Sequence, residues 1–287
     1  MASSLENIID DLVSRRLYMS AALFAEGHNA WNRACELWLQ FGSDSSAAKC
    51  AEKAGNLTQA AQLYRAAGNS YDEKRCASLY LQVVKRLEDG ITAFGQKRYQ
   101  QAAAYFLEII TADPSHLEAL YYLGKTRQEQ GKNTDAIPLL GKTIALIDEK
   151  QEKAIPYSKR VKKSQAYFAL AQAAYAKKFY EKATSALSRA LKCAPHDDTI
   201  QDYARERKQE LEQKGIRYFK RDQYTDAFPL LVSAQTLDAS NDWLARRIGR
   251  CYEVAGDLKN AQKMYARLPE FKNAQIGLRR IKSDTRK

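Results

Sequence analysis

The feature that most constrains the fold is a short pattern that recurs at a fixed distance along the chain. In each copy a polar or helix-breaking turn precedes an alanine, and a bulky residue stands four positions after that alanine. The clearest copies lie 34 residues apart, from Ala102 to Ala136 and from Ala227 to Ala261. A fixed period of this length is typical of helical hairpins that stack on one another. The sequence therefore predicts an all-α fold, an α-solenoid of stacked antiparallel helical hairpins.

The small and bulky positions of the pattern have a physical basis. The two helices of a hairpin cross at small residues, because larger side chains would push the axes beyond about 8–10 Å. Each hairpin alone leaves an apolar face exposed, so that neighbouring hairpins must cover it. The pattern is carried by Gly90, Tyr99, Ala102, Phe106 and Pro114, then by Leu120, Leu123, Gly124, Ala136 and Leu140, then by Tyr167, Leu170, Ala171, Ala183 and Leu187, then by Gly215, Tyr218, Ala227 and Leu231, and finally by Ile248, Gly249, Tyr252, Ala261 and Tyr265.

These residues resemble the tetratricopeptide repeat over about residues 83–275. The resemblance implies a right-handed superhelix. We assign the repeat region to residues 83–268. Its five units follow the frames 83–116, 117–150, 164–197, 208–241 and 242–275, with insertions at 151–163 and 198–207. Residues 269–287 are expected to form a C-terminal capping helix and tail, which overlaps the last frame.

Residues 1–82 form a different region. Ala34 and Trp38 copy the spacing of a second helix, as do Ala60 and Tyr64, but the two copies are 26 residues apart instead of 34. This spacing predicts shorter hairpins that are similar to degenerate tetratricopeptide repeats. Apolar residues then recur every three or four positions, which predicts one helix over about residues 72–96. A second long helix is expected over residues 198–220, which contain no proline.

One heptapeptide occurs twice with few changes, at residues 134–140 and at residues 225–231. Both copies contain a proline, Pro138 or Pro229. Proline is tolerated in the first turn of a helix, where its missing N–H costs little. We therefore expect both prolines in the first turn of a second helix, with Thr134 and Thr225 as candidate N-caps.

Composition favours a basic protein with reduced thiols. Lys and Arg number 46 against 34 Asp and Glu, which gives a net charge of +12 and favours acidic partners. The five cysteines form no CxxC pair, which is typical of a reducing compartment. Acidic residues interrupt the N-terminus, and no stretch approaches the roughly 18–20 apolar residues of a membrane span. We expect a cytoplasmic protein with no membrane span.

Enzyme chemistry is not expected. Residues 119–126 and 136–143 each match a loose phosphate-loop pattern, but both lie inside expected helices, whose N–H groups are already bonded. The three histidines, His28, His116 and His196, stand apart from any Cys/His cluster or catalytic arrangement. No catalytic residue, metal site or cofactor is therefore predicted.

The resemblance implies that the first helix of each hairpin lines the concave groove, where a partner segment binds. The residues that this places in the groove as partner-binding are Tyr121, Lys125, Phe168, Gln172, Tyr175, Phe219, Trp243, Arg246 and Arg250. Aromatic side chains beside cations suit a peptide with bulky and acidic groups. Arg246 and Arg250 are spaced to grip one carboxylate. In some family members a clamp of Lys, Asn and Arg binds the C-terminal tails of chaperones, but Leu87, Ile91 and Tyr122 replace parts of that clamp here.

The function predicted from these features is a non-catalytic scaffold or adaptor that binds a protein segment. Three alternative interpretations remain open. In the first, the aromatic residues of the groove pack between repeats and bind no partner. The chain would bind polyanions or nucleic acid through a basic patch at Lys159, Arg160, Lys162 and Lys163, a reading weakened because such runs are usually solvated surface. It would also suit a structural subunit of a larger complex, held through residues 1–82.

Overall fold

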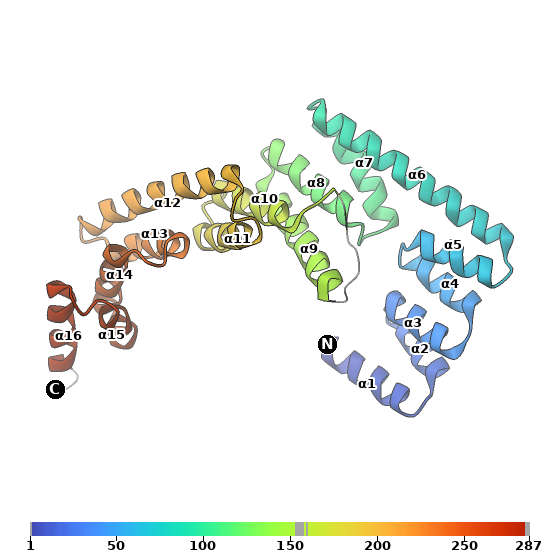
Figure 1. Ribbon diagram of the computed structural model, residues 1–287, viewed down its shortest axis with the longest axis horizontal. Coiled ribbons are helices and arrows are strands. Elements are labelled where there is room, and N and C mark those ends of the chain that lie inside the picture. The colour runs from blue at the N-terminus through green and yellow to red at the C-terminus, as the bar shows by residue number, and fades with distance from the viewer. Residues whose placement is uncertain (1, 153–157, 159, 285–287) are drawn as a thin grey trace. The chain divides into compact units, whose positions relative to one another are not determined.

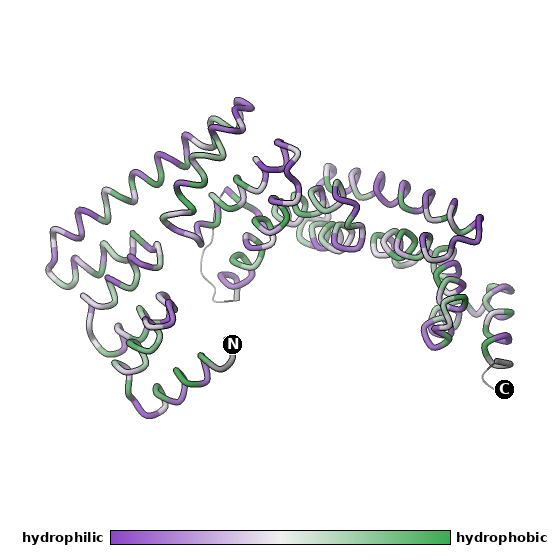
Figure 2. Tube along the Cα trace, turned by 180° about the vertical axis from the view of Figure 1, so that it is seen from behind, coloured by the Kyte–Doolittle hydropathy of each residue, from purple (hydrophilic) through white to green (hydrophobic). Residues whose placement is uncertain are grey.

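The computed structural model describes residues 2–152, 158 and 160–284, and the side chains of residues 2–4, 152 and 282–284 fall outside that description. Sixteen α-helices and no strand occur in the described residues (Figure 1). Apolar and polar residues alternate along the helices, as Figure 2 shows, so that each helix has a side to bury. The expected all-α fold of stacked hairpins is confirmed.

The chain divides into two compact units, residues 1–126 and residues 127–287. In the first unit, each helix from α2 to α6 packs against the next one along the chain. The helices of this unit are α1 (Ala2–Ser14), α2 (Tyr18–Gly27), α3 (Trp31–Phe41), α4 (Asp44–Lys53), α5 (Leu57–Ala66), α6 (Ser70–Gly95), α7 (Tyr99–Ala112) and α8 (Leu117–Glu129), the last of which enters the second unit after Thr126.

The N-terminal hairpins follow the 26-residue spacing of the sequence. Helix α4 begins 26 residues after α2, from Tyr18 to Asp44, and α5 begins 26 residues after α3. Ala34 and Ala60, the small residues of this spacing, are fully buried. They belong to a core rich in alanine and cysteine, which allows the short helices to approach closely.

Helix α6 is the long helix that the apolar spacing predicts. Its N-cap is Asn69, whose side-chain oxygen accepts a hydrogen bond from the N–H of Asp72 at 3.2 Å. Cys76 near its start joins the core of the preceding hairpins. Gly90 near its end faces α7, and a Cβ atom there would lie 2.6 Å from the ring of Phe106. One helix thus packs with the short hairpins at one end and with the repeat region at the other.

The second unit contains three hairpins, α10–α11, α12–α13 and α14–α15, and each pairs a first helix with a second. Helix α9 packs on α10, and α16 packs on α15 at the C-terminal end. The helices are α9 (Asn133–Glu152), α10 (Lys163–Ala176), α11 (Tyr180–Cys193), α12 (Asp198–Phe219), α13 (Tyr224–Leu237), α14 (Asp242–Val254), α15 (Leu258–Ala266) and α16 (Lys272–Asp284). The second long helix and the C-terminal helix therefore form as expected.

Small residues stand at the helix crossings of these hairpins. A Cβ atom on Gly215 would lie 2.8 Å from Leu231, and one on Gly249 would lie 2.7 Å from the ring of Tyr265. Ala227 and Ala261 on the partner helices are fully buried. The physical reason given for the repeated small positions is confirmed.

The expectation for the two prolines is wrong by one turn. Helix α9 begins at Asn133 and α13 at Tyr224, so that Pro138 and Pro229 lie in the second turn. The N-cap of α13 is Gln223, and Thr225 is already helical. The preceding turns contain left-handed residues, Gly131 with φ of 74° and Asp222 with φ of 57°. The chain reverses direction at these residues, and the following helices begin at Asn133 and Tyr224, one residue before Thr134 and Thr225.

Candidate functional site

The sequence-predicted binding residues of the second unit lie on α10, α12 and α14, the first helices of its three hairpins (Figure 1). These helices carry Phe168, Gln172, Tyr175, Phe219, Trp243, Arg246 and Arg250. All but Trp243 are half-buried, and Trp243 is 51% exposed. Trp243 therefore offers the most open aromatic surface among these residues.

Helix α12 covers the aromatic residues of α10. The rings of Phe168 and Tyr203 lie edge to face at 5.3 Å. The guanidinium of Arg207 lies 5.1 Å from the ring of Tyr175 and is ion-paired with Glu210 at 2.7 Å. Burial, with a smaller contribution from Glu210, raises the pKa of the Tyr175 phenol. These contacts use much of the aromatic surface of α10 for packing between repeats.

A cation is enclosed between two aromatic rings where α12 meets α14. The guanidinium carbon of Arg247 lies 3.4 Å from the centroid of the Trp243 ring and 5.8 Å from that of Phe219. Arg247 is only 5% exposed, and its Nη1 donates a hydrogen bond to the Trp243 carbonyl at 3.3 Å. Arg246 also lies near the Trp243 ring, at 5.7 Å. The guanidinium groups of two arginines therefore lie close to the Trp243 ring.

Arg247 is a functional candidate that the sequence reasoning missed. The sequence reading paired Arg246 with Arg250, but Arg250 forms an ion pair with Glu253 at 3.0 Å within α14. The spacing of four residues between Trp243 and Arg247 was the available signal, because such residues meet on one helix face. Arg247, and not Arg250, therefore lies with Arg246 beside the Trp243 ring.

In the first unit, Tyr121 and Lys125 are neighbours on α8. Tyr121 is 5% exposed, and burial raises the pKa of its phenol to about 12. The half-buried Lys125 places its ammonium 6.0 Å from the Tyr121 ring and 5.7 Å from the Phe94 ring. Lys125 offers more surface to a partner than Tyr121 does, and the role of both residues in binding stays a prediction.

The predicted basic patch is only partly described. Lys159 lies outside the described residues, whereas Arg160 and Lys162 are exposed. Lys163 forms an ion pair with Asp148 at 2.6 Å and donates a hydrogen bond to Gln151 at 2.8 Å. The hydrogen bond to Asp148 raises the pKa of Lys163. The charge of Lys163 is therefore used within the fold.

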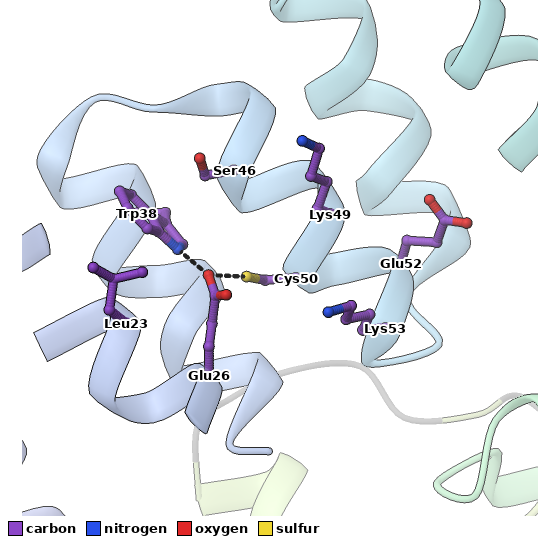
Figure 3. Close-up of a pocket in the computed structure, with 8 residues that line it drawn as sticks. All are labelled: Leu23, Glu26, Trp38, Ser46, Lys49, Cys50, Glu52 and Lys53. Atoms are coloured by element: carbon purple, nitrogen blue, oxygen red, sulfur yellow. Dashed lines mark hydrogen bonds between the residues drawn. The ribbon is translucent and has the colours of Figure 1, made fainter. Parts of the chain in front are cut away.

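The N-terminal hairpins enclose an open pocket of about 570 Å³ that no sequence motif indicated (Figure 3). Its lining includes Glu26 of α2, Trp38 of α3 and Cys50 of α4. The Trp38 indole N–H donates a hydrogen bond to Glu26 Oε1, and the Cys50 thiol donates to the same oxygen at 3.3 Å. Lys49 and Lys53 stand at the rim, so that the pocket carries both signs of charge.

Two other kinds of site are absent from the described residues. The described residues contain no group of three or more His, Cys, Asp or Glu side chains that could hold a metal ion. Among the same residues, no helix is both long and apolar enough to cross a membrane.

Residues 87–150 match the family model of the tetratricopeptide repeat. The tetratricopeptide repeat is therefore present in residues 87–150, and the resemblance noted from the sequence is confirmed over that stretch. Proteins built from this repeat are in general protein-interaction scaffolds. No curated protein sequence matches the chain.

Several solved structures are similar in fold. The tetratricopeptide-repeat domain of P58(IPK) aligns over 98% of this chain and 97% of its own, with 13% identity and a TM-score of 0.47. MamA aligns over 68% of this chain and 91% of its own, with 21% identity and a TM-score of 0.34. YrrB, described as a repeat protein with an unusual peptide-binding site, aligns over 66% and 88%, with 13% identity and a TM-score of 0.34. Similarity at this level says nothing about the partner of this chain.

Proposed function

We propose that the chain is a non-catalytic scaffold or adaptor that binds a segment of another protein on the first helices of its repeats. The observation that carries this proposal is the exposure of Trp243 beside two arginines on α14. Tryptophan and arginine are the side chains that most often supply binding energy at protein interfaces. An exposed tryptophan is otherwise a cost to a solvated helix, and a bound partner would remove it from water.

The proposal places the partner on α14 and on the neighbouring parts of α10 and α12. Phe168, Tyr175 and Phe219 would form the floor of the site, because contacts between helices already hold them. The half-buried Gln172 would lie beside them on α10. Trp243 and Arg246 would supply contacts that are open in the free chain. A cytoplasmic location remains part of the proposal and is supported by five cysteines that are all free thiols.

The test is affinity capture by the full chain, compared with a variant that combines Trp243→Ala and Arg246→Glu. Loss of a binding hot spot costs about 2 kcal/mol or more, so capture of a true partner should fall at least about 30-fold. Circular dichroism of the variant controls for folding. If the same partner is captured equally well by both proteins, the binding surface lies elsewhere.

Binding of polyanions through the basic patch has less support, because Lys163 is paired with Asp148. It predicts that affinity for nucleic acid falls steeply and linearly on a log–log plot against salt. A chain that fails to retard any nucleic acid at low salt would remove this alternative.

A further inference from the structure

Arg247 is a buried cation whose charge is not neutralised. In the described part of the chain, no carboxylate lies within 4 Å of either Arg246 or Arg247, and the hydrogen bond to the Trp243 carbonyl is the bond recorded for Arg247. The negative charge of Glu212 favours the charged form of Arg247, and the positive charge of Arg246 opposes this effect. Burial first, and then the charge of Arg246, lower the pKa of Arg247 to about 10.

Two other arginines on α12 and α14 have carboxylate partners. Arg207, also held against aromatic rings, is ion-paired with Glu210 at 2.7 Å. Arg250, one turn after Arg246 on the same helix, is paired with Glu253 at 3.0 Å. A buried charge is normally paired, because removing an ion from water is costly. Arg247 is buried without such a pair, and it stands with the half-buried Arg246 on the helix that carries the exposed Trp243.

The stacking of rings and guanidinium fixes Trp243 in place. The indole lies over Arg247, which in turn lies over Phe219 on α12. Cation–π contacts of this kind are strongest when the groups are shielded from water. The indole is therefore held in position before any partner arrives, and less conformational entropy is lost on binding.

Building on the proposed function, we propose that this site binds an acidic side chain of the partner segment together with a neighbouring apolar side chain. Arg246 contacts the carboxylate of an internal Asp or Glu, and the buried charge of Arg247 strengthens that contact. The apolar side chain lies on the open surface of Trp243. Arg247 acts as a positioning residue, because its guanidinium is nearly inaccessible. Charge complementarity favours an acidic side chain here, because neither Arg246 nor Arg247 has a carboxylate partner within the described chain.

The probe is a short peptide with blocked termini, acetyl-Gly-Glu-Phe-Gly-amide, and its matched control has Gln in place of Glu. Blocked termini exclude a terminal carboxylate as the source of the charge. The readout is the indole N–H cross-peak of Trp243 in the 15N-labelled full chain. The chain has three tryptophans, so that Trp243→Phe assigns the peak and the peaks of Trp31 and Trp38 serve as internal controls.

The Glu peptide should shift the Trp243 peak in a saturable way. The Gln peptide should bind about 10-fold more weakly, as expected for the loss of a charged hydrogen bond. Arg246→Gln should abolish the preference for Glu. Lys259→Gln removes the same charge from the exposed face of α15, the second helix of the same hairpin, and should leave the preference intact. Arg247→Lys should weaken both peptides and broaden the Trp243 peak, because the stack beneath the indole is lost.

Two results would overturn the inference. Equal binding of the Glu and Gln peptides would show that the site does not select acid, while leaving segment binding on this surface untouched. A Trp243 peak that responds to a single-stranded oligonucleotide but not to the Glu peptide would assign the two arginines to phosphate. The proposed function itself is tested by a separate experiment. It fails if the variant with Trp243→Ala and Arg246→Glu captures the partner as well as the unmodified chain does.

Discussion

The hydroxyl of Tyr265 donates a hydrogen bond to the carboxylate of Glu253 at 2.9 Å. The same arrangement occurs in the N-terminal hairpins, where Tyr64 donates to Glu52 at 3.1 Å. In both cases the glutamate is the next-to-last residue of the first helix of a hairpin, and the tyrosine stands 12 residues later in the second helix. An arginine from the following helix completes each pair. At both places the glutamate therefore links its own hairpin to the helix that follows it.

The Glu52 pair provides a test of this joint. Arg75 of α6 binds Glu52 through two hydrogen bonds of 2.6 and 2.7 Å, and both side chains are partly shielded from water. We expect Arg75→Ala to lower the free energy of unfolding by about 1–2 kcal/mol. Arg15→Ala breaks the well-exposed ion pair with Asp11 and should have a much smaller effect. Urea unfolding followed by circular dichroism measures both. Equal effects of the two substitutions would show that the Arg75–Glu52 contact is an ordinary surface pair.

The same contact predicts a dependence on acid. The hydrogen bonds from Arg75 hold the pKa of Glu52 below its ordinary value of 4.5, although burial opposes them. A carboxylate with a lowered folded pKa stabilises the fold above its unfolded pKa, and this stabilisation is lost as pH falls below about 4.5. NMR titration of the Glu52 side chain should show the lowered pKa, and in Arg75→Ala the pKa should rise because burial is no longer offset. An unchanged pKa in that variant would contradict the assignment.

Position 249, where α14 crosses α15, should tolerate no residue larger than glycine. The Cβ of a residue at position 249 would lie 2.7 Å from the Tyr265 ring, so that Gly249→Leu should cost about 1–3 kcal/mol or more. Gly141 within α9 has no atom within 4 Å of the equivalent position. Gly141→Ala should therefore raise stability by up to about 1 kcal/mol, through helix propensity. Thermal unfolding of the two variants should move in opposite directions, and a neutral Gly249→Leu would refute close packing at this crossing.

The thiols should differ sharply in reactivity. Cys193 is exposed, whereas Cys35, Cys50, Cys76 and Cys251 are buried. Burial raises the pKa of Cys50 to about 12 and that of Cys251 to about 11, so that almost no thiolate is present at pH 8. Iodoacetamide should modify one site in the native chain, and Cys193→Ser should remove it. Rapid modification of a second cysteine, located by peptide mass spectrometry, would show that the hairpins open readily.

The sequence was sufficient to predict features that depend on local spacing. Small residues such as Gly249 and Ala261 recur because backbone approach allows nothing larger, and the long helix α6 follows from uninterrupted apolar spacing. The helix starts near Pro138 and Pro229 were misplaced. Asp222, which has a left-handed backbone, lies in the turn just before α13. This conformation is rare outside glycine, so it could not be predicted from the sequence.

The candidate site was harder to predict, because it depends on which charges the fold neutralises. The sequence places Arg246 and Arg250 one turn apart, but it does not show that Glu253 takes Arg250, or that Trp243 and Phe219 enclose Arg247. Phe219 and Arg247 come from different hairpins, so that their contact depends on how α12 and α14 pack. Pairing across hairpins is a tertiary property that helix periodicity does not encode.

The most direct measurement of the central claim is photo-crosslinking from single positions of the full chain. A benzophenone amino acid at position 243 of α14 is compared with the same group at position 259 of α15, which is also exposed. The account predicts that position 243 crosslinks one defined segment of a partner, that position 259 does not, and that Arg246→Glu reduces the yield at 243. A partner segment crosslinked from position 259 and not from position 243 would contradict it.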